Sequence, residues 1–398
     1  MKIALVHDYL VEYGGAEMVL EDLHQIFPEA PIYVFYLYPH GLGIHYQRIK
    51  NWDIKTSWYQ KMPFARKFLS ASRVIAPFVF EGFDLSDFDV VISSCNTHFA
   101  KAVITKPESL HISYIHTPPK MLYGYTTSFN YKKHLFTKIA AELANHFLRI
   151  WDFEISQRPD ILVANSKNVQ ARIKKFYRRE SEIIYPGVDI EEFGKAKKTQ
   201  GEYFLALNRL MRGKGTEIII EACSRLNLSL KVAGSGHELE TLRKIAGKNV
   251  EFLGAVTEEE KIKLLAGAKA LIVATEQEDF GITPVEAQAA GTPVIAARSG
   301  GYLETVVEGD PSKDSGRGAT GEFFEISPDL GESRQYVDEQ SVNNLIKVLE
   351  KFSSKGRPAS GWDPKKYDPE DCRKQAEKFG KVRFKREILD LIEKNLKK

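Results

Sequence analysis

The stretch ALIVATEQEDFGITPVEAQAAGTPVIAA, residues 270–297, decides the fold. Its apolar ends, 270–274 and 293–297, are typical of strands that are buried on both faces of a sheet. Between them, 284–290 has a helical pattern, with Thr283 suited to the N-cap, Pro284 to the first helical position and Gly291 to the residue after the end. A strand, a helix and a second strand joined by short loops form a βαβ unit, which implies parallel strands.

The same alternation continues on both sides of this stretch. Strand-like runs lie at 2–7, 32–37, 89–93, 111–116, 161–165 and 182–185, and then at 203–208, 229–233 and 250–253. Helical patterns at 215–226, 237–246 and 258–267 separate the runs of the second series. Two such series predict an α/β protein with two Rossmann-like, doubly wound domains.

The boundary between the two domains is expected near Pro186 and Gly187. The stretch 191–201, EEFGKAKKTQG, is charged, small and aperiodic, as a linker should be. We therefore expect one domain at 1–188 and a second at 189–370. The remainder, 371–398, has a helical pattern with little apolar content, so it must pack on another part of the chain to be stable.

Composition excludes several classes of protein. The chain has 398 residues, a net charge of only +3 and three cysteines. The charge does not favour a nucleic-acid binder, and the cysteines lack the spacing of a zinc site or a disulfide framework. No apolar run reaches the roughly 18 residues of a membrane span, and MKIALVHDYL meets Asp8 too early for a signal peptide. We expect a cytoplasmic protein.

Two carboxylates mark the candidate site. Glu278 stands in the loop after the strand at 270–274, at the carboxyl end of a strand, where open α/β sheets bind ligands. The helix that follows offers backbone N–H groups to an anion. Glu286 has an equally good structural interpretation, because Thr283 and Glu286 have the spacing of a capping box.

A set of motifs in a fixed order resembles a known family. Glu278 and Glu286 form E-x7-E, which is followed by AQAAGTPVIA. With GGAE at 14–17, IHTP at 115–118, YPGVD at 185–189, RLMRGKG at 209–215 and GSG at 234–236, this set resembles the retaining glycosyltransferases of family 4. The resemblance covers nearly the whole chain and implies the GT-B fold, with two Rossmann-like domains facing a central cleft. HDYLVEYGGAE and YIHTPP are most similar to the WbaZ-like mannosyltransferases of polysaccharide assembly.

The resemblance implies that the second domain holds a nucleotide-sugar donor. Arg209 and Lys214 would bind the diphosphate and offset its charge without a metal ion, although each alone is as typical of a surface cation. Glu286 would bind the donor ribose. Glu278 would bind hydroxyls of the donor sugar and place negative charge near the oxocarbenium-like centre. Backbone N–H groups of the loop would meet phosphate or sugar oxygens: Phe280, Gly281 and Ile282.

The resemblance assigns two residues of the first domain to the same donor. Gly15 would let the backbone approach the diphosphate, where a side chain would obstruct it. His116 would contact the donor sugar or position the reacting centre, facing Glu278 across the cleft, although a lone histidine at a strand end is more often structural. The helices of 371–398 would cross back to the first domain. Asp87 and Asp89 have a D-x-D spacing, but they precede a strand and are typical of a turn, so we expect neither a metal nor another cofactor.

The expected activity is transfer of a sugar with retention of configuration, with mannose from GDP-mannose as the donor that the WbaZ-like resemblance implies. The acceptor would be a glycan or a lipid-linked glycan. There are two alternatives. The donor could be a UDP-sugar, or the protein could be a non-catalytic module that binds nucleotide-sugar or glycan. Basic residues at 172–179 are typical of a solvated helix face or of contact with anionic lipid, so a peripheral position at the inner face of a membrane is a further hypothesis.

Overall fold

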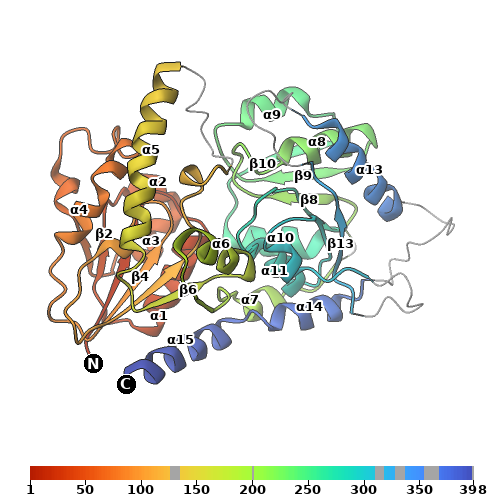
Figure 1. Cartoon of the computed structure of the whole chain (residues 1–398). Helices are drawn as coiled ribbons and strands as arrows, with labels where there is room; N and C mark the ends of the chain where they lie inside the picture. The colour runs from red at the N-terminus through yellow and green to blue at the C-terminus, as the bar shows by residue number, and fades with distance from the viewer. Residues whose placement is uncertain (126–134, 200, 310–317, 328–336, 354–366, 397–398) are drawn as a thin grey trace. The chain divides into compact units, whose positions relative to one another are not determined.

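The protein is described by a computed structural model that covers residues 1–125, 135–199, 201–309, 318–327, 337–353 and 367–396 (Figure 1). Contacts between Cα atoms divide the chain into two compact units. The first comprises Met1–Tyr125, Asn130–Gly187 and Val382–Lys398, and the second consists mainly of Val188–Lys381.

The first unit is built on a seven-stranded parallel sheet. Its strands run in the order β3-β2-β1-β4-β5-β6-β7. All six residues of β4 are buried, because helices cover a parallel sheet on both faces. The order reverses between β1 and β4, and the carboxyl ends of strands at such a switch point are where open α/β sheets bind ligands. The strands are β1 (Ile3–His7), β2 (Ile32–Val34), β3 (Ile54–Thr56), β4 (Val90–Cys95), β5 (Leu110–Ile115), β6 (Ile161–Ala164) and β7 (Glu182–Ile183).

The helices of the first unit include one from the far end of the chain. Phe384, Ile388 and Ile392 of α15 lie in one apolar core with Leu5 of β1 and Ile92 of β4. This burial gives the polar C-terminal helix the packing surface that its sequence requires. The helices are α1 (Gly15–Ile26), α2 (Pro39–Leu42), α3 (Tyr46–Ile49), α4 (Ala76–Glu81), α5 (Leu135–Ile155), α6 (Lys167–Tyr177) and most of α15 (Lys381–Leu396), with short 3-10 turns at η1 (Gly43–His45), η2 (Trp58–Lys61), η3 (Ala71–Val74), η4 (Ala100–Ala102) and η5 (Lys120–Leu122).

The second unit repeats the design with six parallel strands. Their order is β10-β9-β8-β11-β12-β13, so its switch point lies between β8 and β11. The strands are β8 (Phe204–Leu207), β9 (Leu230–Ala233), β10 (Val250–Gly254), β11 (Leu271–Val273), β12 (Val294–Ala297) and β13 (Gly321–Phe324). The helices are α7 (Ile190–Gly194), α8 (Thr216–Arg225), α9 (Leu239–Ile245), α10 (Glu258–Gly267), α11 (Ile282–Ala289), α12 (Tyr302–Thr305), α13 (Glu339–Ser353) and α14 (Pro369–Glu377).

The structure confirms the predicted fold class of two Rossmann-like parallel-sheet domains, with three local corrections. The edge strands β3 and β13 were not predicted. The stretch expected to be an aperiodic linker contains α7, because the Asp189 carboxylate accepts the Glu192 N–H at 3.2 Å and caps a short helix. Helix α11 begins at Ile282 after Gly281, so Thr283 lies inside the helix and is not its N-cap.

Within the described ranges, no helix combines the length and the apolar content that crossing a bilayer requires.

Candidate active site

An ion pair joins the two loops at the switch point of the second sheet. Lys214 follows β8 and Glu278 follows β11, and the Lys214 Nζ lies 3.0 Å from the Glu278 Oε2. The two side chains are 27% and 20% exposed, so a ligand can reach both. The sheet thus places a cation and a carboxylate together where ligands of α/β proteins bind.

Tyr302 lies beside the Glu278 carboxylate. Its hydroxyl is 3.5 Å from the Glu278 Oε2, and its ring is 3% exposed. Burial raises the pKa of the Tyr302 hydroxyl well above its ordinary value, and the Glu278 charge raises it further. Tyr302 therefore stays a neutral phenol, which can donate toward Glu278 or toward a bound sugar.

Glycines allow the loops to approach one another. A Cβ on Gly301 would lie 2.4 Å from the Phe280 Cα, and the Gly301 N–H donates to the Glu278 carbonyl at 2.9 Å. Gly300 has φ +55°, and a Cβ there would lie 2.1 Å from the same carbonyl. The Gly300–Gly301 pair therefore sets the position of the Glu278 loop.

Replacement of Gly301 by alanine is expected to lower activity by about 10²-fold, because a shift of about 1 Å in a positioning loop has that effect. The new methyl group would displace backbone of the loop that carries Glu278. Gly194→Ala is the matched control, since the nearest atom to its Cβ would be 4.0 Å away. Initial rates, with circular dichroism to verify folding, measure the difference. Equal rates for the two variants would contradict the role of Gly301.

Glu286 does not form the capping box with Thr283 that its spacing suggested. Its side chain is 2% exposed, and its Oε1 accepts a hydrogen bond from the Lys261 Nζ at 2.8 Å. Lys261 also pairs with Glu258 at 2.6 Å. Burial alone would lower the pKa of the Lys261 ammonium, but the two carboxylates outweigh burial and raise it. Lys261, which lies on α10, therefore stays charged and holds the Glu286 carboxylate in place.

The remaining predicted residues of the second unit surround the same two loops. Phe280 is buried, with its ring 5.4 Å from that of Phe379, so only its backbone is suited to ligand contact. Gly281 has φ +94° and is the N-cap of α11, whose first N–H groups have no partner within the helix. Ile282 is the first residue of that helix. Arg209 is exposed and follows β8, at the start of the loop that ends in Lys214.

In the first unit, His116 lies directly after β5. Its ring Nε2 is 2.8 Å from the Ser94 Oγ, its N–H donates to the Cys95 carbonyl, and its own carbonyl accepts from the Asn165 side chain at 2.9 Å. Gly15 is exposed and is the first residue of α1. His116 and Gly15 therefore both lie near the switch point between β1 and β4. The prediction that His116 faces Glu278 stays a prediction, since the two residues belong to different units.

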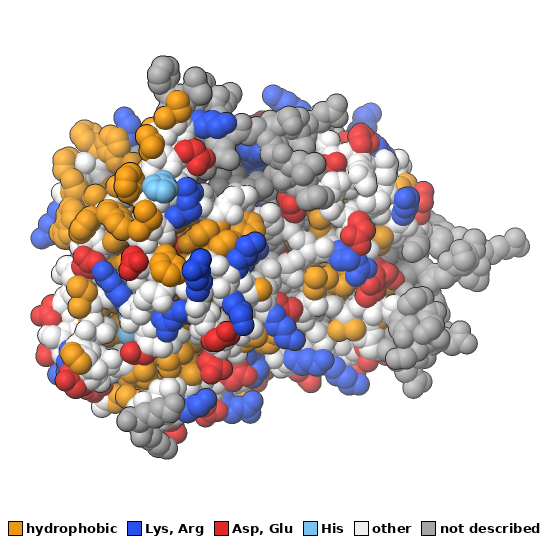
Figure 2. All heavy atoms as spheres, in the orientation of Figure 1, with side chains coloured by type: hydrophobic (Ala, Val, Ile, Leu, Met, Phe, Trp, Pro, Cys, Tyr) orange, Lys and Arg blue, Asp and Glu red, His pale blue; other side chains and the backbone are white. Residues whose placement is uncertain are grey.

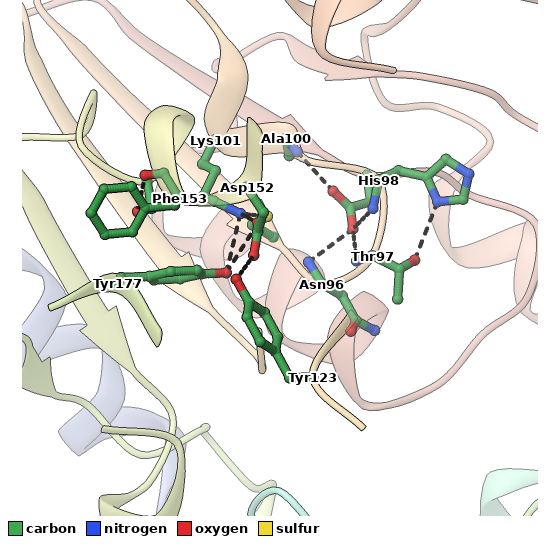
Figure 3. Close-up of polar contacts among 12 residues, drawn as sticks. Asn96, Thr97, His98, Ala100, Lys101, Tyr123, Asp152, Phe153 and Tyr177 are labelled. Atoms are coloured by element: carbon green, nitrogen blue, oxygen red, sulfur yellow. Dashed lines mark hydrogen bonds and ion pairs between the residues drawn. The ribbon is translucent and has the colours of Figure 1, made fainter. Parts of the chain in front are cut away.

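Two buried polar clusters stiffen this end of the first unit. The Asp8 Oδ2 accepts from the N–H groups of Asn96, Thr97 and His98, which Figure 3 labels. Burial would raise the pKa of Asp8, but the His98 ring, the N–H groups of His98 and Ala100 and the His7 ring together outweigh it and lower the pKa. The carboxylate thereby fixes the loop that follows β4.

The second cluster is an ion pair in the core. The Lys101 Nζ lies 2.5 Å from the Asp152 Oδ1, and both side chains are 0% exposed. The hydroxyls of Tyr123 and Tyr177 also donate to Asp152, at 2.7 and 3.2 Å (Figure 3). Burial would lower the pKa of Lys101, but Asp152 outweighs it and raises the pKa. The ammonium therefore stays charged at neutral pH.

Sequence reasoning did not find Lys261, Tyr302 or Ser94. Lys261 lies on a predicted helix with many charges, so nothing in the pattern distinguishes it. Tyr302 follows the glycine pair at 300–301. Ser94 is one of two serines in a buried strand, and the alternation of side chains along strands could have marked it as the one beside His116.

Two parallel-sheet domains, each with candidate residues at the switch point of its sheet, define the class as GT-B. The solved structure of Anabaena Alr3699/HepE in complex with UDP and glucose has the same fold, with a TM-score of 0.68 and 17% identity, and the match covers 99% of each chain. At this identity the likeness shows the fold alone.

Two glycosyltransferase family models each match part of the chain. Residues 188–327 match Glycosyl transferases group 1, and residues 13–192 match Glycosyltransferase Family 4. The two parts of the chain are therefore similar to glycosyltransferase domains of group 1 and family 4.

Curated relatives match part of the chain. The D-inositol 3-phosphate glycosyltransferase of Corynebacterium urealyticum is 29% identical over 194 residues, which are 40% of this chain and 46% of the relative. A GDP-mannose-dependent monoacylated alpha-(1-6)-phosphatidylinositol monomannoside mannosyltransferase of Corynebacterium glutamicum is 32% identical over 183 residues, 38% and 48% of the two chains. The chain spans about half the length of the curated relatives it matches.

Proposed function

We propose that this protein transfers a sugar from a nucleotide-sugar to a glycan or lipid-linked glycan, with retention of configuration and without a metal ion. The observation that carries the proposal is the Lys214–Glu278 pair at the switch point of the second sheet, beside the start of α11. A cation and helix N–H groups suit a diphosphate, and a carboxylate suits sugar hydroxyls. A nucleotide-sugar donor contains both a diphosphate and sugar hydroxyls.

The cations and the backbone would hold the diphosphate. Arg209 and Lys214 would bind its oxygens and stabilise the charge that develops as the sugar leaves. The N–H groups at the start of α11, from Phe280 to Ile282, would add hydrogen bonds to the same oxygens or to the sugar. Gly15, at the start of α1, would bring backbone N–H groups of the first unit to the diphosphate.

The carboxylates would hold the two sugars of the donor. Glu286 would bind the ribose, and Lys261 would orient its carboxylate. Burial raises the pKa of the Glu286 carboxyl, and the Lys261 charge offsets part of that effect. Glu278 would bind hydroxyls of the transferred sugar and stabilise positive charge at its C1. His116 would contact this sugar from the first unit.

The reaction proposed is a front-face displacement. The bond between C1 and the phosphate oxygen breaks, and the acceptor oxygen bonds to C1 on the same face. The acceptor proton passes to the departing phosphate, so no carboxylate needs to attack C1. Retention follows because both bonds lie on one face of the sugar.

The donor proposed is GDP-mannose. The WbaZ-like motifs and the GDP-mannose-dependent relative support it. UDP-sugars are the second candidate, because HepE, with the same fold, is in complex with UDP and glucose.

The test is release of nucleoside diphosphate from GDP-mannose and from UDP-glucose in EDTA, with a lipid extract as the source of acceptor. Wild-type protein is expected to release GDP much faster than Glu278→Ala, and the product anomer should keep the donor configuration. Faster release of UDP would keep the activity and exclude the mannosyl donor. Equally low turnover of wild type and Glu278→Ala with both donors would favour a non-catalytic module that binds nucleotide-sugar. Activity abolished by EDTA would contradict the metal-free step.

A basic and apolar surface of the first unit suits contact with an anionic membrane, where a lipid-linked acceptor would lie. The segment 58–78 has no acidic residue, and Lys61, Arg66 and Lys67 are exposed on it. Figure 2 shows hydrophobic side chains gathered where Figure 1 places α4 and α5. The segment exposes 44–75% of each of six large apolar side chains: Trp58, Met62, Phe64, Phe68, Val74 and Phe78.

In the basic cluster at 172–179, two arginines bond within the fold, whereas Lys174, Lys175 and Arg178 are exposed. Arg172 is 6% exposed and donates to the Thr117 hydroxyl at 2.9 Å. Arg179 donates to the backbone carbonyls of Ser156 and Pro159. The segment 58–78 is therefore the better candidate for lipid contact.

Wild-type protein is expected to sediment with vesicles that contain phosphatidylglycerol at low salt and to be released at 0.5 M salt, since salt screens surface charges. The double variant Phe64→Ser/Phe68→Ser should bind at least about 10-fold more weakly, because burying each phenylalanine contributes about 1.5–3 kcal/mol. Val382→Ser removes a side chain that is 77% exposed on α15 and serves as the control. Failure of the wild type to sediment would refute the membrane proposal.

A further inference from the structure

A chain of buried polar groups connects His116 to the start of α1. The Ser94 Oγ lies 2.8 Å from the His116 Nε2 and 3.0 Å from the His7 Nδ1. The His7 Nε2 lies 3.5 Å from the Glu17 Oε1, and the Glu17 Oε2 accepts the Gly14 N–H at 2.8 Å. The four residues that contribute these groups are at most 8% exposed: Glu17, His7, Ser94 and His116.

The sheet makes this arrangement rigid. His7 is the last residue of β1 and is paired in register with Ser94 of β4, while His116 directly follows β5. The Asp8 carboxylate holds the backbone just beyond Ser94 through four N–H groups, from Asn96 to Ala100 (Figure 3). Ser94 therefore has little freedom to choose another partner.

The direction of the hydrogen bonds follows from the carboxylate at one end. The negative charge of Glu17 favours a proton on the His7 Nε2, so in neutral His7 the Nδ1 accepts. Ser94 then donates its one proton to His7, and its oxygen accepts from the Nε2–H of His116. When His116 is neutral its ring carries one proton, so a proton on Nε2 leaves Nδ1 as the acceptor.

We propose that Ser94, His7 and Glu17 are positioning residues that fix the ring orientation and the tautomer of His116, with the proton on Nε2. This proposal rests on the proposed function, in which His116 contacts the donor sugar. His116 in this tautomer accepts a hydrogen bond from a sugar hydroxyl through Nδ1. The row of hydrogen-bonded groups ends at the Gly14 N–H, next to Gly15. The same side chains therefore position both His116, which would contact the sugar, and the backbone at Gly15, which would contact the diphosphate.

The neighbouring residue provides a matched control. The Ser93 Oγ lies 2.9 Å from the His111 Nε2, and both residues are fully buried on the opposite face of the sheet. Burial lowers the pKa of His111 to about 3, so its ring is neutral at neutral pH. Ser93→Ala and Ser94→Ala therefore each remove one buried serine–histidine hydrogen bond from the same strand, but only Ser94→Ala touches His116.

The test combines 15N NMR of histidine-labelled protein with kinetics. In the wild type, the His116 signals, assigned with His116→Gln, should show a protonated Nε2 and an unprotonated Nδ1. Ser94→Ala should mix the two tautomers and lower kcat at least about 10-fold, as expected for a group that orients an active-site histidine, with little change in donor affinity. Ser93→Ala should leave the His116 signals and kcat unchanged. Ser94→Cys, which keeps the volume but hydrogen-bonds weakly, provides a second variant if Ser94→Ala does not fold.

The His116 NMR signals test the positioning role, and the kinetics test the proposed function. A protonated Nδ1 on His116 in the wild type, or equal His116 signals in Ser94→Ala and Ser93→Ala, would overturn the positioning role whatever the activity. Signals that change as expected in a protein that turns over no donor would refute the proposed function and leave the positioning role intact.

Discussion

Replacing Lys214 with alanine is expected to lower kcat for sugar transfer by about 10²–10³-fold, the usual effect of removing one group that stabilises developing charge. Lys214 is expected to act mostly on the leaving diphosphate, so kcat should fall more than donor affinity. The variant also removes the partner of Glu278, 3.0 Å away. Steady-state kinetics together with donor titration separate the two effects.

The control for Lys214 is Lys263→Ala. Lys263 also belongs to the second unit and pairs with Glu259 at 2.6 Å, but the two side chains are 72% and 78% exposed. An exposed pair of this kind contributes about 0–1 kcal/mol and should not affect catalysis. If Lys263→Ala and Lys214→Ala have the same kcat, Lys214 does not act on the leaving group.

The largest effect on stability is expected for Asp152→Ala. This change leaves the Lys101 ammonium, which is 0% exposed, without its carboxylate. Breaking a buried pair on one side lowers the free energy of unfolding by about 3–5 kcal/mol. The two tyrosine hydroxyls would lose an acceptor as well. Urea unfolding followed by circular dichroism should show an earlier transition.

Two further variants test the cause of this loss. Replacing both partners, with Lys101→Met and Asp152→Leu, should destabilise less than Asp152→Ala alone, because no unpaired charge is then buried. Glu180→Ala removes a pair with Lys174 whose side chains are 68% and 80% exposed, and it should change stability by at most about 1 kcal/mol. A double variant that is as unstable as Asp152→Ala would point to lost packing rather than to the unpaired charge.

Much of the fold follows from local sequence pattern. The prediction of a helix at 258–267 coincides with α10, because Thr257 and Glu260 form a capping box that can be read directly from the sequence. The same rule gave the wrong start for α11. There Gly281 adopts φ +94° and is the N-cap, and Glu286 binds Lys261, a partner 25 residues away.

The missed features depend on contacts distant in sequence. The edge strands β3 and β13 have three and four residues, and only their pairing with β2 and β12 makes them strands. The contact of Ser94 with His7 and His116 depends on the order and register of three strands, which no local pattern specifies. Motif spacing located Lys214 and Glu278, but it did not show that they touch.

The central claim is that the switch point of the second sheet binds a nucleotide-sugar through Arg209 and Lys214. The most direct test is calorimetric titration of GDP and UDP into the protein without divalent metal, with Arg209→Ala in parallel. We predict clear binding of GDP that is lost in Arg209→Ala. Binding of neither nucleotide, or equal affinity of the wild type and Arg209→Ala, would contradict the claim.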